Sequence, residues 1–106
     1  MIPLKRRRVA RTPVHPGEIL HDELIETGVS HKALARILKL SANQMEEFLR
    51  GKSPLSADMA LRLGRYFRTS AELWMNLQKM YELDRARLTI GKALDRIPQR
   101  RKEHIF

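Results

Sequence analysis

Apolar residues recur every three or four positions through the middle of the chain, which is the spacing of amphipathic helices rather than of strands. In the first such segment, Ile19, Leu20 and Leu24 form one apolar stripe. No segment shows the strict alternation of a half-buried strand, and no internal repeat is visible. The pattern therefore predicts five short helices and an all-α fold class. The predicted spans are 16–27, 31–38, 42–50, 57–67 and 71–88.

Residues that favour helix ends mark the boundaries of these segments. Pro16 suits the first position of a helix, and the residue before it is pushed toward the extended geometry of an N-cap. Gly28 suits the left-handed position that ends a helix. A serine, whose hydroxyl can accept a hydrogen bond from the first helical turn, precedes each of the other four helices. These serines are Ser30, Ser41, Ser56 and Ser70.

The charge is concentrated at the two ends of the chain. The formal net charge is +9, of which residues 1–12 carry +5 and residues 100–106 carry +2. We therefore predict a flexible basic N-terminal arm over 1–12, which either seeks phosphate or serves only as a solvated tail. A folded domain is expected over 13–88. A C-terminal helical tail follows over 89–106, where Gly91 and Pro98 weaken any continuation of the fifth helix.

The composition argues against several classes of protein. With no cysteine, the chain has no disulfide frame and suits the reducing cytoplasm. No apolar run approaches the ~18 residues of a membrane span. The histidines form no HExxH motif. His15, Glu18 and Asp22 recur on one helical face, as metal ligands would, but a helix cap followed by a solvated face explains them better. We expect no enzyme, no metal and no cofactor.

The second and third predicted helices are joined by a turn of only three residues, which is the outline of a helix-turn-helix. Ala35 is small enough to let the two helices cross closely. Leu40, just after the turn, can fill the core between them, and Met45 and Phe48 are expected to face inward from the third helix.

The opposite side of the third helix carries groups that can read base edges. Asn43, Glu47 and Arg50 lie on its outer pole, with Gln44 and Glu46 on the flanks. Amides pair with adenine, and a carboxylate accepts a hydrogen bond from cytosine in the major groove. Glu46 and Arg50 are also spaced as a favourable surface ion pair, and we prefer this reading for Glu46. The side chains of this helix thus favour recognition of specific bases over nonspecific binding to phosphate.

Contacts with the phosphate backbone are expected from residues near the helix amino ends, where unpaired N–H groups attract anions. His31 is equally well explained as an ordinary exposed residue. The candidates for these contacts are Ser41, His31, Lys32 and Lys52.

The stretch from HPGEIL through SADMALRLGRYF to AELWMNLQ, about residues 13–85, resembles the HigA antitoxin family, a branch of the phage-repressor-like helix-turn-helix proteins. The resemblance implies a homodimer that represses its own operon by binding operator DNA and that neutralises a small mRNA-cleaving toxin of the HigB type. A free-standing repressor without a toxin is the alternative. The operator-reading positions implied are Ser41, Ala42, Asn43, Gln44 and Glu47, with Lys52 near the DNA backbone.

Two residues depart from the family pattern. Lys39 stands in the turn where glycine is usual and where the backbone is left-handed, at a cost on the order of 1 kcal/mol. His31 stands where glutamine is common.

Two other surfaces are candidates for protein contacts. Trp74, Leu77 and Tyr81 follow one another at helical spacing, so they form part of the core or, failing that, a dimer contact. The first helix carries acids and no lysine or arginine, which indicates either a solvated face or a docking surface for a basic partner. Its acidic residues are Glu18, Asp22, Glu23 and Glu26.

Overall fold

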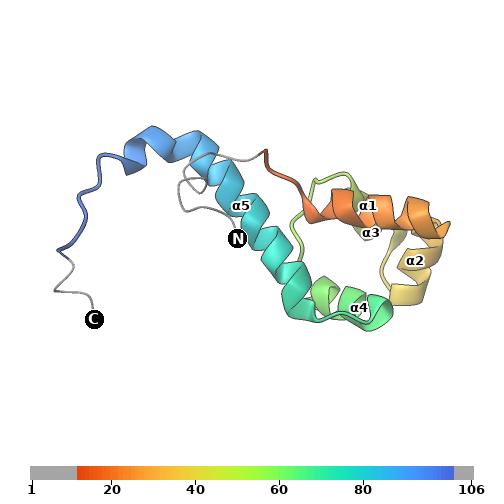
Figure 1. The fold of residues 1–106 in the computed structure, drawn as a ribbon. Helices are drawn as coiled ribbons and strands as arrows, with labels where there is room; N and C mark the ends of the chain where they lie inside the picture. The colour runs from red at the N-terminus through yellow and green to blue at the C-terminus, as the bar shows by residue number, and fades with distance from the viewer. Residues whose placement is uncertain (1–11, 102–106) are drawn as a thin grey trace.

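The computed structural model describes residues 12–101 and contains five α-helices and no strand within them (Figure 1). The predicted all-α fold is therefore confirmed. The basic arm predicted over 1–12 lies outside the described residues except for Thr12, as do residues 102–106 of the tail. The helices are α1 (Pro16–Thr27), α2 (His31–Leu38), α3 (Ala42–Leu49), α4 (Ala57–Phe67) and α5 (Ala71–Leu94).

The predicted caps lie where the sequence placed them. Each of the four serines accepts a hydrogen bond from the backbone N–H three residues later. His15 caps α1, and Gly28 closes it with a φ of 75°. Arg50, predicted inside the third helix, is its C-cap. Local capping chemistry therefore sets four of the five helix spans to within one residue.

The core lies where α1 to α4 and the first half of α5 meet. Leu20, Leu34 and Phe48 are fully buried within it. Ile19 was predicted to share the apolar stripe of α1, but it is 36% exposed. One residue before Leu20, Ile19 is turned by about 100° around the helix and faces away from the core. The remaining buried apolar residues are Leu24, Ala35, Leu38, Met45, Leu55, Met59, Ala60, Leu63 and Trp74.

The turn between α2 and α3 has the left-handed geometry that the motif requires. Lys39 adopts φ 59° and ψ 41°, and the N–H of Leu40 donates to the carbonyl of Ala35 at 2.8 Å. Leu40 packs against the core, as predicted. Arg68, at the end of α4, has a similar φ of 61°. The sequence did not predict this second left-handed residue. Both turns thus store strain that glycine would relieve.

Helix α5 is longer than predicted. It continues through Gly91 to Leu94, so the expected end at residue 88 was wrong. A solvent-facing glycine costs a helix only about 1 kcal/mol relative to alanine, and Lys92, Ala93 and Leu94 all favour helix. The first half of α5 packs on α4, whereas its second half extends away from the rest of the domain (Figure 1). No helix in residues 12–101 combines the length and apolar character of a membrane span.

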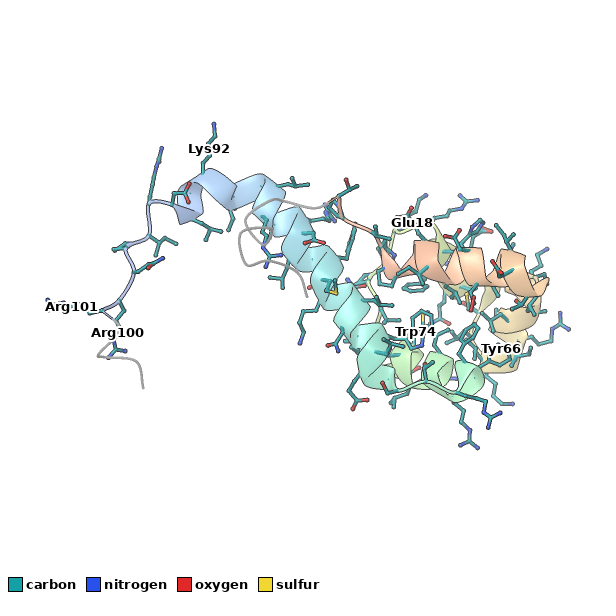
Figure 2. All side chains as sticks on the ribbon, viewed as in Figure 1. Glu18, Tyr66, Trp74, Lys92, Arg100 and Arg101 are labelled. Atoms are coloured by element: carbon teal, nitrogen blue, oxygen red, sulfur yellow. The ribbon has the colours of Figure 1, made fainter. Side chains whose placement is uncertain are left out.

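The apolar stripe at the start of α5 belongs to the core. Trp74 is buried and points from α5 into the domain, where its indole N–H donates to Thr69 Oγ1 at 3.0 Å (Figure 2). Leu77 packs against the same core, and the ring of Tyr81 lies edge-on to His15. The core reading is therefore confirmed for Trp74 and Leu77, whereas Tyr81 is half-buried at the edge of the core.

Candidate DNA-binding surface

Helices α2 and α3 pack together through buried apolar residues and leave the outer face of α3 exposed. Met45 and Phe48 are fully buried, and Ala35 is buried where the two helices meet, as predicted. Lys32 is exposed in the first turn of α2. The remaining candidates are all exposed along α3 and just beyond its end, and at 100° per residue Asn43, Glu47 and Arg50 share one face of the helix. These exposed candidates are Ser41, Ala42, Asn43, Gln44, Glu47, Arg50 and Lys52.

The first turn of α3 holds two of these residues in a reciprocal cap. Ser41 Oγ accepts from the N–H of Gln44 at 3.0 Å, and Gln44 Oε1 accepts from the N–H of Ser41 at 2.9 Å. Within the described part of the chain the amide nitrogen of Gln44 has no hydrogen-bond acceptor, so it can donate while its oxygen is engaged. The Asn43 side chain forms no hydrogen bond within residues 12–101, so both of its polar atoms can meet a base edge.

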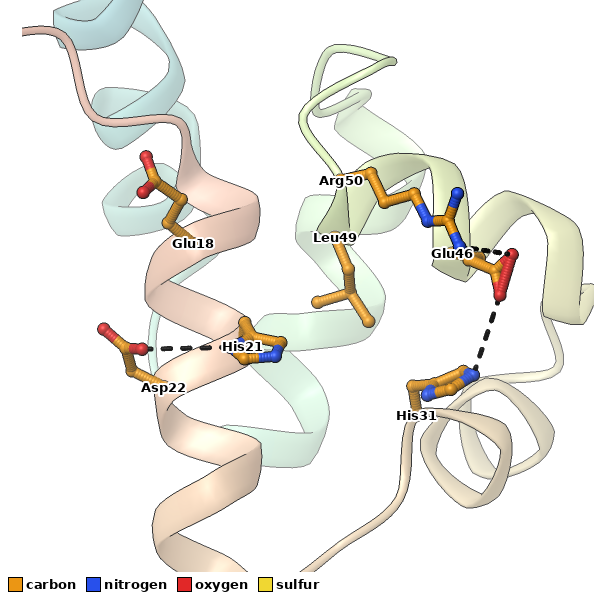
Figure 3. Close-up of a pocket in the computed structure, with 7 residues that line it drawn as sticks. All are labelled: Glu18, His21, Asp22, His31, Glu46, Leu49 and Arg50. Atoms are coloured by element: carbon orange, nitrogen blue, oxygen red, sulfur yellow. Dashed lines mark ion pairs between the residues drawn. The ribbon is translucent and has the colours of Figure 1, made fainter.

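Glu46 takes part in the predicted surface pair. Its carboxylate lies 3.7 Å from Arg50 and 4.0 Å from His31 (Figure 3). These side chains are 41–62% exposed, so the pairs are screened by water and contribute little to stability. His31 points toward Glu46 rather than outward along α3. Glu46, Arg50 and His31 line a cleft of about 440 Å³ between α1, α2 and α3. The cleft is also lined by Glu18, His21, Asp22 and Leu49.

The loop after α3 carries Lys52 and is held from several sides. The N–H of Lys52 donates to the carbonyl of Glu47 at 2.8 Å. The N–H of Leu55 donates to Oε1 of the buried Gln78 at 2.9 Å, and His15 Nε2 contacts the carbonyl of Ser53 at 2.9 Å. The sequence indicated His15 only as a helix cap and gave no signal for Gln78, because both contacts join residues more than twenty positions apart.

Comparison with known proteins shows which proteins this chain resembles in sequence and in fold. Over 74 residues the chain is 43% identical to virulence-associated protein I of Dichelobacter nodosus, covering 69% of this chain and 68% of that protein. It is 32% identical over 78 residues to antitoxin HigA-1 of Vibrio cholerae, covering 73% of each. The structure of Pseudomonas aeruginosa antitoxin HigA with the higBA promoter superposes with a TM-score of 0.77 at 50% identity, covering 83% of this chain and 97% of that one. The chain belongs to the HigA antitoxin family. No protein-family model matches it.

Membership of the HigA family confirms the five-helix, phage-repressor-like helix-turn-helix fold that the resemblance implied. The relatives that the chain matches include antitoxins and HTH-type transcriptional regulators. Among residues 12–101 of this HigA-family chain, no three His, Asp or Glu side chains are grouped as metal ligands. Both ring nitrogens of His15 are occupied by backbone contacts, so the cap reading of His15, Glu18 and Asp22 stands.

Proposed function

We propose that this chain is the antitoxin of a type II toxin–antitoxin pair, which binds operator DNA in its own promoter and neutralises a small mRNA-cleaving toxin of the HigB type. The exposed outer face of α3, carried on a buried apolar inner face, is the observation on which the DNA-binding part rests. The P. aeruginosa HigA structure with promoter DNA supports it by similarity. Because operator DNA lies in the bacterial cytoplasm, the protein acts there.

The roles of the site residues follow from their chemistry. Asn43, with both amide atoms free, reads an adenine edge in the major groove. Gln44 donates through its amide nitrogen, and Glu47 accepts from cytosine. Lys52 contacts the phosphate backbone from the loop after α3, and Arg50 adds positive charge beside it.

The amino ends of α2 and α3 supply further phosphate contacts. Ser41, Lys32 and His31 lie at these ends, where the helix dipole favours an anion. The basic arm over 1–12 adds sequence-independent attraction, which weakens as the salt concentration rises.

Two substitutions separate base reading from phosphate grip. Asn43→Ala removes a base contact, so it weakens binding to the promoter duplex by a factor of roughly 5–150 for each protomer bound and leaves binding to a scrambled duplex unchanged. Lys52→Ala weakens binding to both duplexes and lowers the salt slope by about 0.9 for each protomer bound. Fluorescence anisotropy over a salt titration measures both effects. Equal losses on the two duplexes for Asn43→Ala would refute its assignment.

An exposed stripe along α5 supports a homodimer. Its five apolar residues are 42–48% exposed and lie within about 100° of the helix surface, on a different side from Trp74. A row of this length left open to water is typical of a protein interface. A second copy of the chain is the occupant we infer, because two recognition helices can then read half-sites about 34 Å apart. The stripe consists of Leu73, Met80, Leu83, Ile90 and Leu94.

The dimer is tested by placing a charge on the stripe. Leu83→Glu puts a carboxylate into the apolar contact and is expected to give a monomer in light scattering coupled to size exclusion. Leu88→Glu is the matched control, since Leu88 is 59% exposed but lies outside the stripe. A dimer that survives Leu83→Glu would place the interface elsewhere.

The toxin partner is tested by purification from the native host. The acidic face of α1, which includes the exposed Glu18 and Asp22, is the surface we assign to a basic partner. High salt and nuclease remove molecules held through nucleic acid. A stoichiometric small ribonuclease that stays bound would support the antitoxin assignment. A chain that purifies alone as a dimer would instead favour a free-standing repressor.

A further inference from the structure

His15 is a buried side chain whose ring is bound at both nitrogens. It is 5% exposed. Nδ1 accepts a hydrogen bond from the N–H of Gly17 at 2.8 Å, and Nε2 lies 2.9 Å from the carbonyl oxygen of Ser53. An amide N–H can only donate and a carbonyl can only accept, so the ring is held as the neutral tautomer with its proton on Nε2. The helix cap accounts for only the first of these bonds.

The same ring is packed between three parts of the molecule. Phe48 of α3 lies edge-on at 5.3 Å between centroids, and Tyr81 of α5 lies edge-on at 4.9 Å. Gly51, with a φ of 74°, presents its open side to the ring, because a Cβ there would lie 3.6–3.8 Å from His15 ring and Cβ atoms. The start of α1, the end of α3, the loop after α3 and α5 therefore meet at one imidazole.

The residues beside His15 reinforce this junction. A Cβ on Gly17 would lie 2.0 Å from the carbonyl oxygen of Phe48, so the first turn of α1 rests directly on the backbone at the end of α3. Glu18 Oε2 accepts from the N–H of His15 at 3.3 Å and completes the capping box. The motif His-Pro-Gly-Glu thus packs the start of α1 against the C-terminal end of α3.

We propose that His15 is a positioning residue for DNA binding: through its bond to Ser53 it holds the loop that carries Lys52 in the conformation that meets the phosphate backbone. This inference rests on the proposed operator binding. A flexible loop would lose conformational entropy when it binds DNA. Because the bond to His15 already orders the loop in the folded protein, less entropy is lost on binding. His15 itself touches no DNA, since it is buried behind the loop.

Two substitutions at His15 separate the cap from the loop contact. Asn is among the best N-caps but is too short to reach Ser53, so His15→Asn keeps the cap and loses the loop contact. Gln carries its amide nitrogen as many bonds from the backbone as Nε2 of His, but caps poorly. His15→Gln therefore keeps the loop contact at the expense of the cap.

The affinity of each variant is measured for two DNA duplexes, one from the promoter upstream of the gene and one with a scrambled sequence. A single phosphate contact contributes about eightfold in affinity at 0.1 M salt and about 0.9 in the salt slope for each protomer. His15→Asn is expected to lose up to this amount on both duplexes, and His15→Gln to lose little. The double variant His15→Asn with Lys52→Ala should bind no more weakly than Lys52→Ala alone, because both act on one contact.

Two controls separate this role from a general loss of stability. Leu63→Val shortens a buried side chain of α4 and removes no hydrogen bond to the loop, so it lowers the melting temperature and leaves the salt slope unchanged. In the absence of DNA, amide hydrogen exchange at Lys52 and Leu55 should accelerate in His15→Asn and remain slow in His15→Gln.

The outcomes are distinct. Additive losses in the double variant, or a salt slope that His15→Asn leaves unchanged, would overturn the proposal. If His15→Asn does not fold, His15→Gln decides, and a folded His15→Gln with a reduced slope would overturn it. A wild-type chain that binds the promoter and the scrambled duplex equally would refute operator binding itself, whatever the exchange rates show about the loop.

Discussion

The strained turn at Lys39 offers a substitution that should stabilise the protein. Lys39 has φ 59° and ψ 41° and an exposed side chain, so the lysine supplies little packing to offset its conformation. The left-handed region costs an L-residue roughly 1–2 kcal/mol. Glycine avoids that cost but loses roughly 0.5–1 kcal/mol more backbone entropy on folding. The difference predicts that Lys39→Gly stabilises the domain by about 0.7 kcal/mol.

Thermal unfolding followed by circular dichroism measures this effect. A gain of this size raises the melting temperature of a domain of this length by about 3–5 °C. Lys39→Ala is the matched control, because alanine removes the same charge but keeps the Cβ that causes the strain. Protein concentration is held constant, since a dimer melts at a temperature that depends on it. Equal melting temperatures for the glycine and alanine variants would refute the assignment of strain to this turn.

Two further substitutions test the packing of α1 and the surface pair on α3. Gly17→Ala places a Cβ 2.0 Å from the carbonyl oxygen of Phe48, and we expect it to destabilise the domain by about 3 kcal/mol or more; an unchanged midpoint in urea denaturation would contradict this contact. Glu46→Gln removes only the exposed pairs with Arg50 and His31, so its effect on stability should stay below about 0.5 kcal/mol. Anisotropy with promoter and scrambled duplexes should show unchanged base preference, and a relaxed preference would make Glu46 a base-reading residue.

The sequence predicted the features that depend on neighbouring residues. The serine caps, the proline at the start of α1 and the glycine at its end act within one helical turn, so their effect can be read from short stretches of sequence. The inward positions of Met45 and Phe48 follow from periodicity alone. The outward face of α3, with Asn43, Glu47 and Arg50, follows in the same way.

The features that were missed depend on distant parts of the chain. His15 contacts Ser53 across 38 positions, and Leu55 contacts Gln78 across 23. Neither contact leaves a periodic signal. Gly91 does not weaken α5 as predicted, because a glycine whose Cβ position faces open space costs little inside a helix that is otherwise favoured. Arg68 gave no warning of its left-handed conformation, since arginine seldom adopts it.

If the chain pairs through the α5 stripe, as we propose, the projecting half of α5 would allow operator spacing to change while the base sequence of each half-site stays the same. The recognition helix α3 is fixed to the core, whereas three of the five residues of the apolar stripe lie on the projecting half of α5: Leu83, Ile90 and Leu94. If two copies cross one heptad further along α5, each recognition helix moves by about 10 Å along its own α5 axis, a length comparable to about three base pairs of B-DNA. Sequence drift in α5 would then select among operators of different length, while drift in α3 would select among their base sequences.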